Sequence, residues 1–221
     1  MKDSLFVNEI FGSIDGEGIR TGELATFIRL AGCNIRCRYC DTDYSLKACQ
    51  GESMTIEDII SECKKIGYKN ITLTGGEPLL QKNSFELIDK LISEDFNVNI
   101  ETNGSIDITP LLNKNCIITL DYKTLSSGEN NKMLLNNYNK LRSWDVLKFV
   151  CNKEDFNDIK KVLKENEIKS YIYLSPIFNE IEPSELVEFL KELNKENYNT
   201  DKMRVQVQLH KIIWDPNKRG V

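Results

Sequence analysis

Three cysteines lie within eight residues in the segment GCNIRCRYCDT, at Cys33, Cys37 and Cys40. Thiolates at this density bind metals, and a closed zinc site or a 4Fe–4S cluster normally takes four of them. A set of three leaves one metal position open, and a catalytic centre needs an open position to bind water or substrate. The triplet therefore indicates a reactive metal centre.

The remaining cysteines have other expected roles. Cys63 lies on the apolar face of an expected helix and Cys116 opens an expected buried strand, so both are predicted to be core residues. Cys151 ends an expected strand and its role stays open. Cys49 follows the triplet in a loop, and a zinc site of four cysteines completed by Cys49 is an alternative reading.

Composition narrows the class of protein. The chain has 221 residues, 40% hydrophobic, which is enough for one core, and we expect a single domain over residues 1–221. Its net charge is -5 and its 29 Lys and Arg residues are scattered, which predicts a small-molecule substrate and no nucleic-acid partner. Polar residues interrupt the N-terminal apolar runs, and the cysteine number, seven, is odd. We therefore expect a cytoplasmic protein with reduced thiols and no membrane contact.

Strand and helix patterns alternate along the chain. Short apolar segments typical of buried strands occupy residues 24 to 30, 70 to 74, 98 to 102, 116 to 121, 146 to 151, 171 to 175 and 203 to 209. Amphipathic helices are expected over residues 56 to 66, where Thr55 and Asp58 form a capping box, and over 85 to 92, 156 to 163 and 183 to 193. About six such units predict an α/β fold, a partial (β/α)6-type TIM-like barrel with mostly parallel strands.

Motifs that could perform chemistry follow these strands. The cysteine loop, TGGEP (74 to 78), ETNG (101 to 104), DYK (121 to 123), the Ser175-Pro176 pair and QLHK (208 to 211) each come after one strand. Active sites of β/α barrels lie at the carboxyl ends of the strands, so these six motifs are expected to converge on one rim. Within DYK, Asp121 and Lys123 supply the acceptor and the donor that ribose hydroxyls require.

The cysteine spacing, with Tyr39 before the last cysteine, resembles the signature of the radical S-adenosylmethionine (SAM) enzymes. The resemblance implies a 4Fe–4S cluster on the triplet, with SAM bound to its fourth iron. It further implies that SAM contacts the segments after the strands, at Tyr39, Cys40, Asp41, Gly75, Gly76, Glu77, Thr102, Asn103, Asp121, Tyr122, Lys123, Ser175 and Pro176.

The N-terminal SIDGEG and the CDT that ends the cysteine motif resemble the 7-carboxy-7-deazaguanine synthase family, over essentially the whole chain. That resemblance implies a radical SAM lyase of 7-deazapurine (queuosine precursor) biosynthesis. Its reaction is the ring contraction of 6-carboxy-5,6,7,8-tetrahydropterin to 7-carboxy-7-deazaguanine, with loss of ammonia. It also implies Mg2+, a homodimer, and a flavodoxin or ferredoxin-like electron donor.

The same resemblance assigns the substrate and Mg2+ positions. Thr42 matches the Mg2+ ligand, which is chemically reasonable because Mg2+ keeps several ligands from substrate and water. Substrate contacts are implied at Ile14, Asp15, Gly16, Glu17, Arg29, Thr74 and His210. Asp15 departs from the family, which commonly has glutamine there. His210, the only histidine, is expected on the polar side of the last strand, facing either solvent or the pocket.

Two alternatives remain. The segment DGEGIR resembles the DGPGIR of glycyl-radical-enzyme activases, whose substrate is a protein glycine, although CDT and Glu17 differ from that group. The other is the non-catalytic zinc module completed by Cys49. Iron and sulfide, or stoichiometric zinc, in anaerobically purified protein distinguish the zinc module from the radical enzymes.

Overall fold

The computed structural model describes residues 3–221, so the first two residues of the expected domain lie outside it. Its framework is a nine-stranded sheet in the order β3-β1-β2-β4-β5-β6-β7-β8-β9. The strands are β1 (Ser4–Ile14), β2 (Leu24–Leu30), β3 (Glu52–Thr55), β4 (Asn70–Gly75), β5 (Asn97–Thr102), β6 (Cys116–Tyr122), β7 (Val146–Cys151), β8 (Tyr171–Pro176) and β9 (Met203–Val205).

All neighbouring strands from β2 to β9 pair in parallel, which confirms the expected fold class. At the other end, β1 pairs antiparallel with both β2 and β3. The two antiparallel partners, β1 and β3, were not expected from the sequence. β1 matters for function because it ends at Ile14, where the SIDGEG loop begins.

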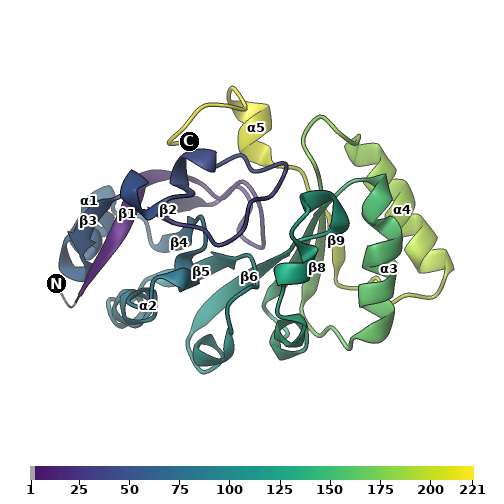
Figure 1. Cartoon of the computed structure of the whole chain (residues 1–221), viewed down its shortest axis with the longest axis horizontal. Helices are drawn as coiled ribbons and strands as arrows, with labels where there is room; N and C mark the ends of the chain where they lie inside the picture. The colour runs from purple at the N-terminus through teal and green to yellow at the C-terminus, as the bar shows by residue number, and fades with distance from the viewer. Residues whose placement is uncertain (1–2) are drawn as a thin grey trace.

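Four amphipathic helices cover the sheet: α1 (Ile56–Ile66), α2 (Ser84–Ser93), α3 (Phe156–Glu165) and α4 (Pro183–Lys195). Figure 1 shows α1 and α2 near one end of the sheet and α3 and α4 side by side at the other. Thr55 Oγ1 accepts a hydrogen bond from the Asp58 amide at 3.1 Å, as the expected capping box requires. Within residues 3–221, no helix is long and apolar enough to cross a membrane.

Two expectations at the C-terminal end are wrong: the extent of the last strand and the placement of His210 on it. The last strand ends at Val205 and not at residue 209, because its neighbour β8 ends at Pro176, which has no N–H to extend the ladder. His210 instead lies on a short helix, α5 (Leu209–Ile213), so the strand alternation does not orient it. Between β5 and β7, across the fully described residues 103–145, the crossovers contain only 3-10 turns in place of helices.

The inner strands have one apolar and one polar face. Leu73, Ile100, Leu120 and Leu147 belong to the buried core that packs under the helices. The positions between them are polar and buried or half-buried: Thr72, Thr74, Asn99, Glu101, Thr119, Asp121 and Lys148. Because side chains alternate across a strand, these polar residues share the opposite face of the sheet. That face carries the chemistry.

Candidate active site

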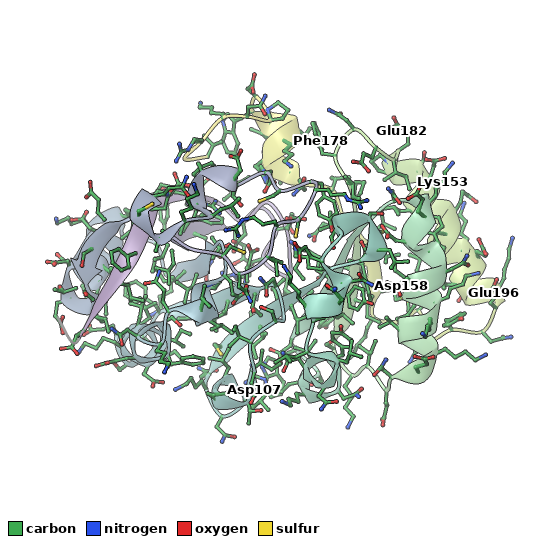
Figure 2. All side chains as sticks on the ribbon, in the orientation of Figure 1. Asp107, Lys153, Asp158, Phe178, Glu182 and Glu196 are labelled. Carbon is green, nitrogen blue, oxygen red and sulfur yellow. The ribbon has the colours of Figure 1, made fainter. Side chains whose placement is uncertain are left out.

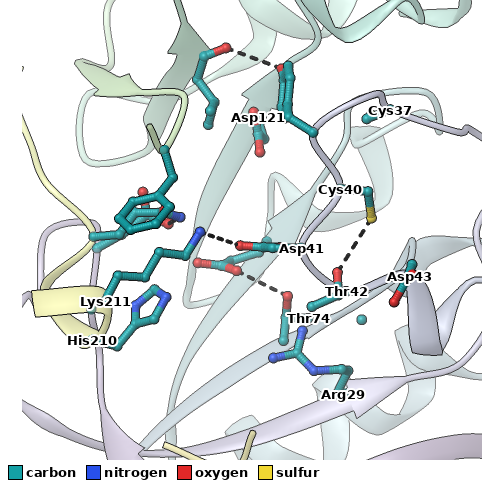
Figure 3. A pocket seen from close by; sticks show the side chains of 18 of the residues that line it. Arg29, Cys37, Cys40, Asp41, Thr42, Asp43, Thr74, Asp121, His210 and Lys211 are labelled. Carbon is teal, nitrogen blue, oxygen red and sulfur yellow. Dashed lines mark hydrogen bonds and ion pairs between the residues drawn. The ribbon is translucent and has the colours of Figure 1, made fainter. Parts of the chain in front are cut away.

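A cavity of about 900 Å³ opens over the polar face of the sheet. The cysteine loop, the SIDGEG loop, the ends of β2 and β4 to β7, α5 and the C-terminal segment line it. In Figure 3, side chains from these elements point toward one another across the cavity, among them Cys40, Asp121, Arg29 and His210. The expected convergence at the carboxyl ends of the strands is thus present for every motif except the Ser175-Pro176 pair.

Most of the residues that the sequence singled out line this cavity. They are Ile14, Asp15, Gly16, Glu17, Arg29, Cys33, Cys37, Tyr39, Cys40, Asp41, Thr42, Thr74, Gly75, Gly76, Thr102, Asn103, Asp121, Lys123 and His210. Four others do not line it: Glu77, Tyr122, Ser175 and Pro176. Tyr122 faces the core, where its ring packs on Tyr138 and Phe149 and its hydroxyl donates to Asp158.

The three cysteines of the triplet are free thiols and half-buried. Burial raises the pKa of the Cys33 thiol, and that of Cys37 to about 11, so metal binding here releases protons. Cys49 is exposed and does not line the cavity, whereas Cys63, Cys116 and Cys151 are buried, as predicted for the first two. Within residues 3–221, no three His, Cys, Asp or Glu side chains are grouped around a single-ion site.

The glycine-rich loop after β4 lies against the cysteine loop. A Cβ atom on Gly76 would lie 2.6 Å from the Cys33 Cβ, so only glycine allows this approach. Glu77 is completely buried and accepts hydrogen bonds from the Leu79 amide, the Asn103 amide and the Thr102 hydroxyl. Its carboxylate therefore ties the glycine loop to the ETNG loop. Burial raises the pKa of Glu77 to about 7, although the three hydrogen-bond donors favour the ionised form and lower the pKa.

The DYK segment presents a paired carboxylate and ammonium to the cavity. Lys123 Nζ lies 2.9 Å from Asp121 Oδ2. The other oxygen, Oδ1, is buried and has no hydrogen-bond partner among residues 3–221. Tyr39 crosses toward the same region, where its hydroxyl donates to the Val150 carbonyl at 3.2 Å. A buried acceptor without a donor fits a ligand hydroxyl at this position.

Asp15 belongs to the SIDGEG loop and stabilises it through an ion pair with Arg20 and a hydrogen bond to β4. Its carboxylate pairs with Arg20 at 2.9 Å and accepts a hydrogen bond from Thr72 at 2.6 Å. Arg20 in turn donates to the carbonyls of Ile71 and Asn97. The residue that departs from the family thus joins a buried ion pair that supports the next residues, Gly16 and Glu17.

The Glu17 carboxylate and the Arg29 guanidinium line the cavity, and both already make hydrogen bonds to neighbouring side chains. Glu17 accepts from Ser175 Oγ at 3.2 Å, from Gln208 Nε2 at 3.4 Å and from Lys148 Nζ at 3.3 Å. Arg29 pairs through Nε with Glu9 at 2.7 Å, and no hydrogen bond to residues 3–221 occupies its two terminal nitrogens. Those nitrogens suit an anionic ligand.

The α5 segment covers the cavity from the opposite side. Lys211 pairs with Asp41 at 3.0 Å, which ties α5 to the end of the cysteine loop (Figure 3). Phe178 lies beside α5 (Figure 2), with its ring centroid 5.1 Å from Lys211 Nζ. Residues 216–221 continue along the cavity, and the Arg219 guanidinium lies 3.5 Å from the Tyr44 ring centroid. The sequence analysis did not assign this segment.

Sequence reasoning assigned no role to several charged residues that line the cavity, among them Glu101 of the ETNG motif and Lys148. Glu101, near the end of β5, is half-buried and accepts a hydrogen bond from Thr74 Oγ1 at 3.0 Å. Lys148 is a lysine in the middle of the apolar strand VLKFVC. A charge inside an otherwise apolar strand is costly unless it is paired, and that signal could have revealed Lys148 before the structure did.

Comparison with known proteins identifies the family. A profile of the Radical SAM superfamily matches residues 27–193. A 7-carboxy-7-deazaguanine synthase from Clostridium acetobutylicum is 45% identical, over 97% of this chain and 98% of its own length. Another from Leptospira interrogans is 33% identical, over 97% of both chains. This chain belongs to the 7-carboxy-7-deazaguanine synthase family.

Solved structures agree on the fold of this member of the 7-carboxy-7-deazaguanine synthase family. QueE from Escherichia coli superposes with a TM-score of 0.73, at 22% identity, over 92% of this chain and 94% of that one. Streptococcus suis SuiB matches 80% of this chain and 48% of its own, with a TM-score of 0.57. The chain is thus a radical SAM lyase, and radical SAM chemistry uses a 4Fe–4S cluster and SAM.

The residues present fit both groups. A cluster takes each cysteine on a different iron, so its ligands need not converge on one point as those of a single ion do. Three free thiols on one cavity meet that requirement. For SAM, the cavity offers the tight Gly76 backbone beside the cysteines and the unpartnered Asp121 Oδ1.

Proposed function

We propose that this protein converts 6-carboxy-5,6,7,8-tetrahydropterin to 7-carboxy-7-deazaguanine with loss of ammonia, a step of 7-deazapurine (queuosine precursor) biosynthesis. The observation that carries the proposal is a single cavity lined by the cysteine triplet and by Glu17, Arg29 and His210. Its full-length similarity to the Clostridium acetobutylicum synthase supports the same reaction.

In this proposal Cys33, Cys37 and Cys40 hold the cluster, which when bound supplies the electron for reductive cleavage of SAM. Gly75, Gly76, Thr102 and Asn103 line the wall beside the cysteines and position the methionine end of SAM. Asp121 and Lys123 bind its ribose hydroxyls, the former through its unpartnered oxygen. Glu77 acts indirectly, since its three hydrogen bonds fix the two loops around it.

The substrate is proposed to lie between the SIDGEG loop and α5. Glu17 accepts from the guanidine-like edge of the pterin, Arg29 faces its carboxylate, and Thr74 and His210 complete its polar contacts. Thr42 contributes a hydroxyl to Mg2+ together with the substrate carboxylate and water. Thr42 Oγ1 lies 3.9 Å from Cys40 Sγ, so this position brings Mg2+ close to the cluster ligands.

The cellular setting is part of the proposal. We infer a cytoplasmic homodimer that receives electrons from a flavodoxin or ferredoxin-like donor. Such a donor supplies the low potential that reductive cleavage of SAM requires, which lies at the negative end of the range of cluster potentials.

An anaerobic assay with carboxytetrahydropterin, SAM, Mg2+ and a reductant tests the proposed function. We expect a deazaguanine product, one equivalent of ammonia per turnover, and SAM that is not consumed in proportion to product. A sample with full iron and sulfide content that binds SAM and forms no product would refute the proposed substrate. Formation of a glycyl radical on an added protein would instead favour the activase alternative.

A further inference from the structure

Lys148 is the most deeply buried cation of the cavity. It lies in the middle of β7 between Leu147 and Phe149, both fully buried in the core, and its own side chain is on the polar face. Only 7% of the Lys148 side chain is exposed. Its ammonium lies between a carboxylate of the proposed substrate region, Glu17, and a carboxylate of the proposed cofactor region, Asp121.

One of these groups belongs to the proposed substrate region. Lys148 Nζ lies 3.3 Å from Glu17 Oε2. Gln208 also donates to that oxygen, and Ser175 donates to Glu17 Oε1. The Glu17 carboxylate is therefore held by residues from β7, β8 and the segment before α5, so its orientation depends on Lys148.

The other group belongs to the proposed cofactor region. Lys148 Nζ lies 3.7 Å from Asp121 Oδ2, the oxygen that Lys123 also contacts at 2.9 Å. The two ammonium groups both attract Oδ2, which leaves Oδ1 free of hydrogen bonds within residues 3–221. Lys148 thus helps to decide which Asp121 oxygen is available for a ribose hydroxyl.

The charges around Lys148 favour a permanent cation. Burial opposes its charge, but Glu17, Asp121 and Glu101 together raise the pKa of Lys148 well above its ordinary value. An ammonium with a pKa this far above neutral stays protonated at pH 7, which makes it poorly matched to the role of general acid or base there. What remains is an electrostatic and positional role between the two carboxylates.

We propose that Lys148 is a positioning residue that couples the substrate and cofactor subsites, by holding Glu17 and Asp121 in their binding orientations at once. This inference rests on the proposed function, in which Glu17 binds the pterin and Asp121 binds SAM. When one ligand orders its carboxylate, the shared ammonium is ordered as well, so the other carboxylate is positioned for the second ligand. The coupling is reciprocal by thermodynamic necessity.

Lys148→Met tests this role, because methionine keeps much of the length and removes the charge. Isothermal titration of cluster-loaded protein measures SAM affinity with and without the pterin, and pterin affinity with and without SAM. In wild type we expect each ligand to tighten the other by about tenfold, within the usual range of allosteric coupling. In Lys148→Met we expect both affinities to fall and the mutual effect to disappear.

Lys160→Met is the matched control. Lys160 is also an ion-paired lysine, but it lies on α3, away from the cavity. Its ammonium donates hydrogen bonds to Glu192 of α4 and to Glu196, which is labelled in Figure 2. Its substitution should leave both affinities and their coupling unchanged. Loss of only one affinity in Lys148→Met, or retention of the mutual effect, would overturn the inference.

Glu17→Gln gives a second measurement that needs neither the pterin nor a stable Lys148→Met. Freed from Glu17, the Lys148 ammonium is expected to close on Asp121 and draw it from its binding orientation. SAM affinity should then fall about threefold, although Glu17 lies in the substrate region. Unchanged SAM affinity would contradict the coupling. If wild-type protein does not bind the pterin, the proposed function fails, while this measurement still decides the role of Lys148.

Discussion

Gly16 lies directly beneath the His210 imidazole: a Cβ atom on Gly16 would be 2.3 Å from His210 Nδ1. The contact is reinforced by the backbone, because the Leu209 amide donates to the Gly16 carbonyl at 3.0 Å. The SIDGEG loop and α5 are about 190 residues apart in the sequence, and this pair of residues joins them over the cavity.

We therefore predict that Gly16→Ala weakens pterin binding at least tenfold, since the new methyl group must push the imidazole aside. Iron content and SAM affinity should stay close to wild type. The double variant Gly16→Ala, His210→Ala removes the clash, so its pterin affinity should equal that of His210→Ala alone. A further loss in the double variant would mean that Gly16 acts independently of His210.

His210→Ala should reduce pterin affinity by about 1–3 kcal/mol, the usual cost of leaving a buried polar partner unpaired. Burial lowers the pKa of His210, so the ring is neutral at pH 7.5, with one donor and one acceptor nitrogen. Separate titrations with the pterin and with SAM check this prediction. Equal losses for both ligands would indicate a collapsed site and contradict a specific contact.

Cys37→Ala should abolish the full cluster, because Cys37 lines the cavity with Cys33 and Cys40. Cys49→Ala is the matched control and should keep its iron, since Cys49 is exposed and outside the cavity. Iron and sulfide content after anaerobic reconstitution measures both. A full cluster in Cys37→Ala, or a lost one in Cys49→Ala, would contradict the assignment of the ligands.

Thr42→Ala should weaken the dependence of turnover on Mg2+ more than it weakens SAM cleavage, because the hydroxyl is proposed to touch the ion and not the cofactor. Thr42→Ser retains the hydroxyl and should behave as wild type. Product formation and deoxyadenosine formation, each measured across a Mg2+ titration, separate the two effects. Full activity of the wild-type enzyme without Mg2+ would exclude the role given to Thr42.

Glu77 should make stability depend on pH. The pKa of Glu77 is near 4.5 in the unfolded chain and is raised to about 7 in the folded protein. Between these two pH values, Glu77 is therefore protonated in the folded state and ionised in the unfolded state. Stability from this residue is therefore present at low pH and falls as pH rises through that window, by on the order of 3 kcal/mol. Glu77→Gln cannot titrate, so urea unfolding from pH 4.5 to 8 should show this decline in wild type and not in the variant.

The sequence by itself determined most of the strands and helices and singled out the cysteine triplet as the proposed cluster ligands. Short β-branched runs and helical spacing predict strands and helices through local physics, and β2 and β7 have the expected bounds. The cysteine spacing and the motifs after the strands predicted one rim, because the carboxyl ends of parallel strands meet at one edge of a sheet. These inferences needed only short stretches of chain.

Tertiary structure decided which polar side chains meet. Tyr122 lies next to Asp121 in sequence, yet strand alternation sends its ring into the core and the Asp121 carboxylate into the cavity. His210 reaches the cavity from a helix and not from a strand, because Pro176 of β8 has no N–H to extend the ladder beyond Val205. Lys148 reaches Glu17 and Asp121 only when three distant segments pack together, and local spacing carries no information about contacts of that range.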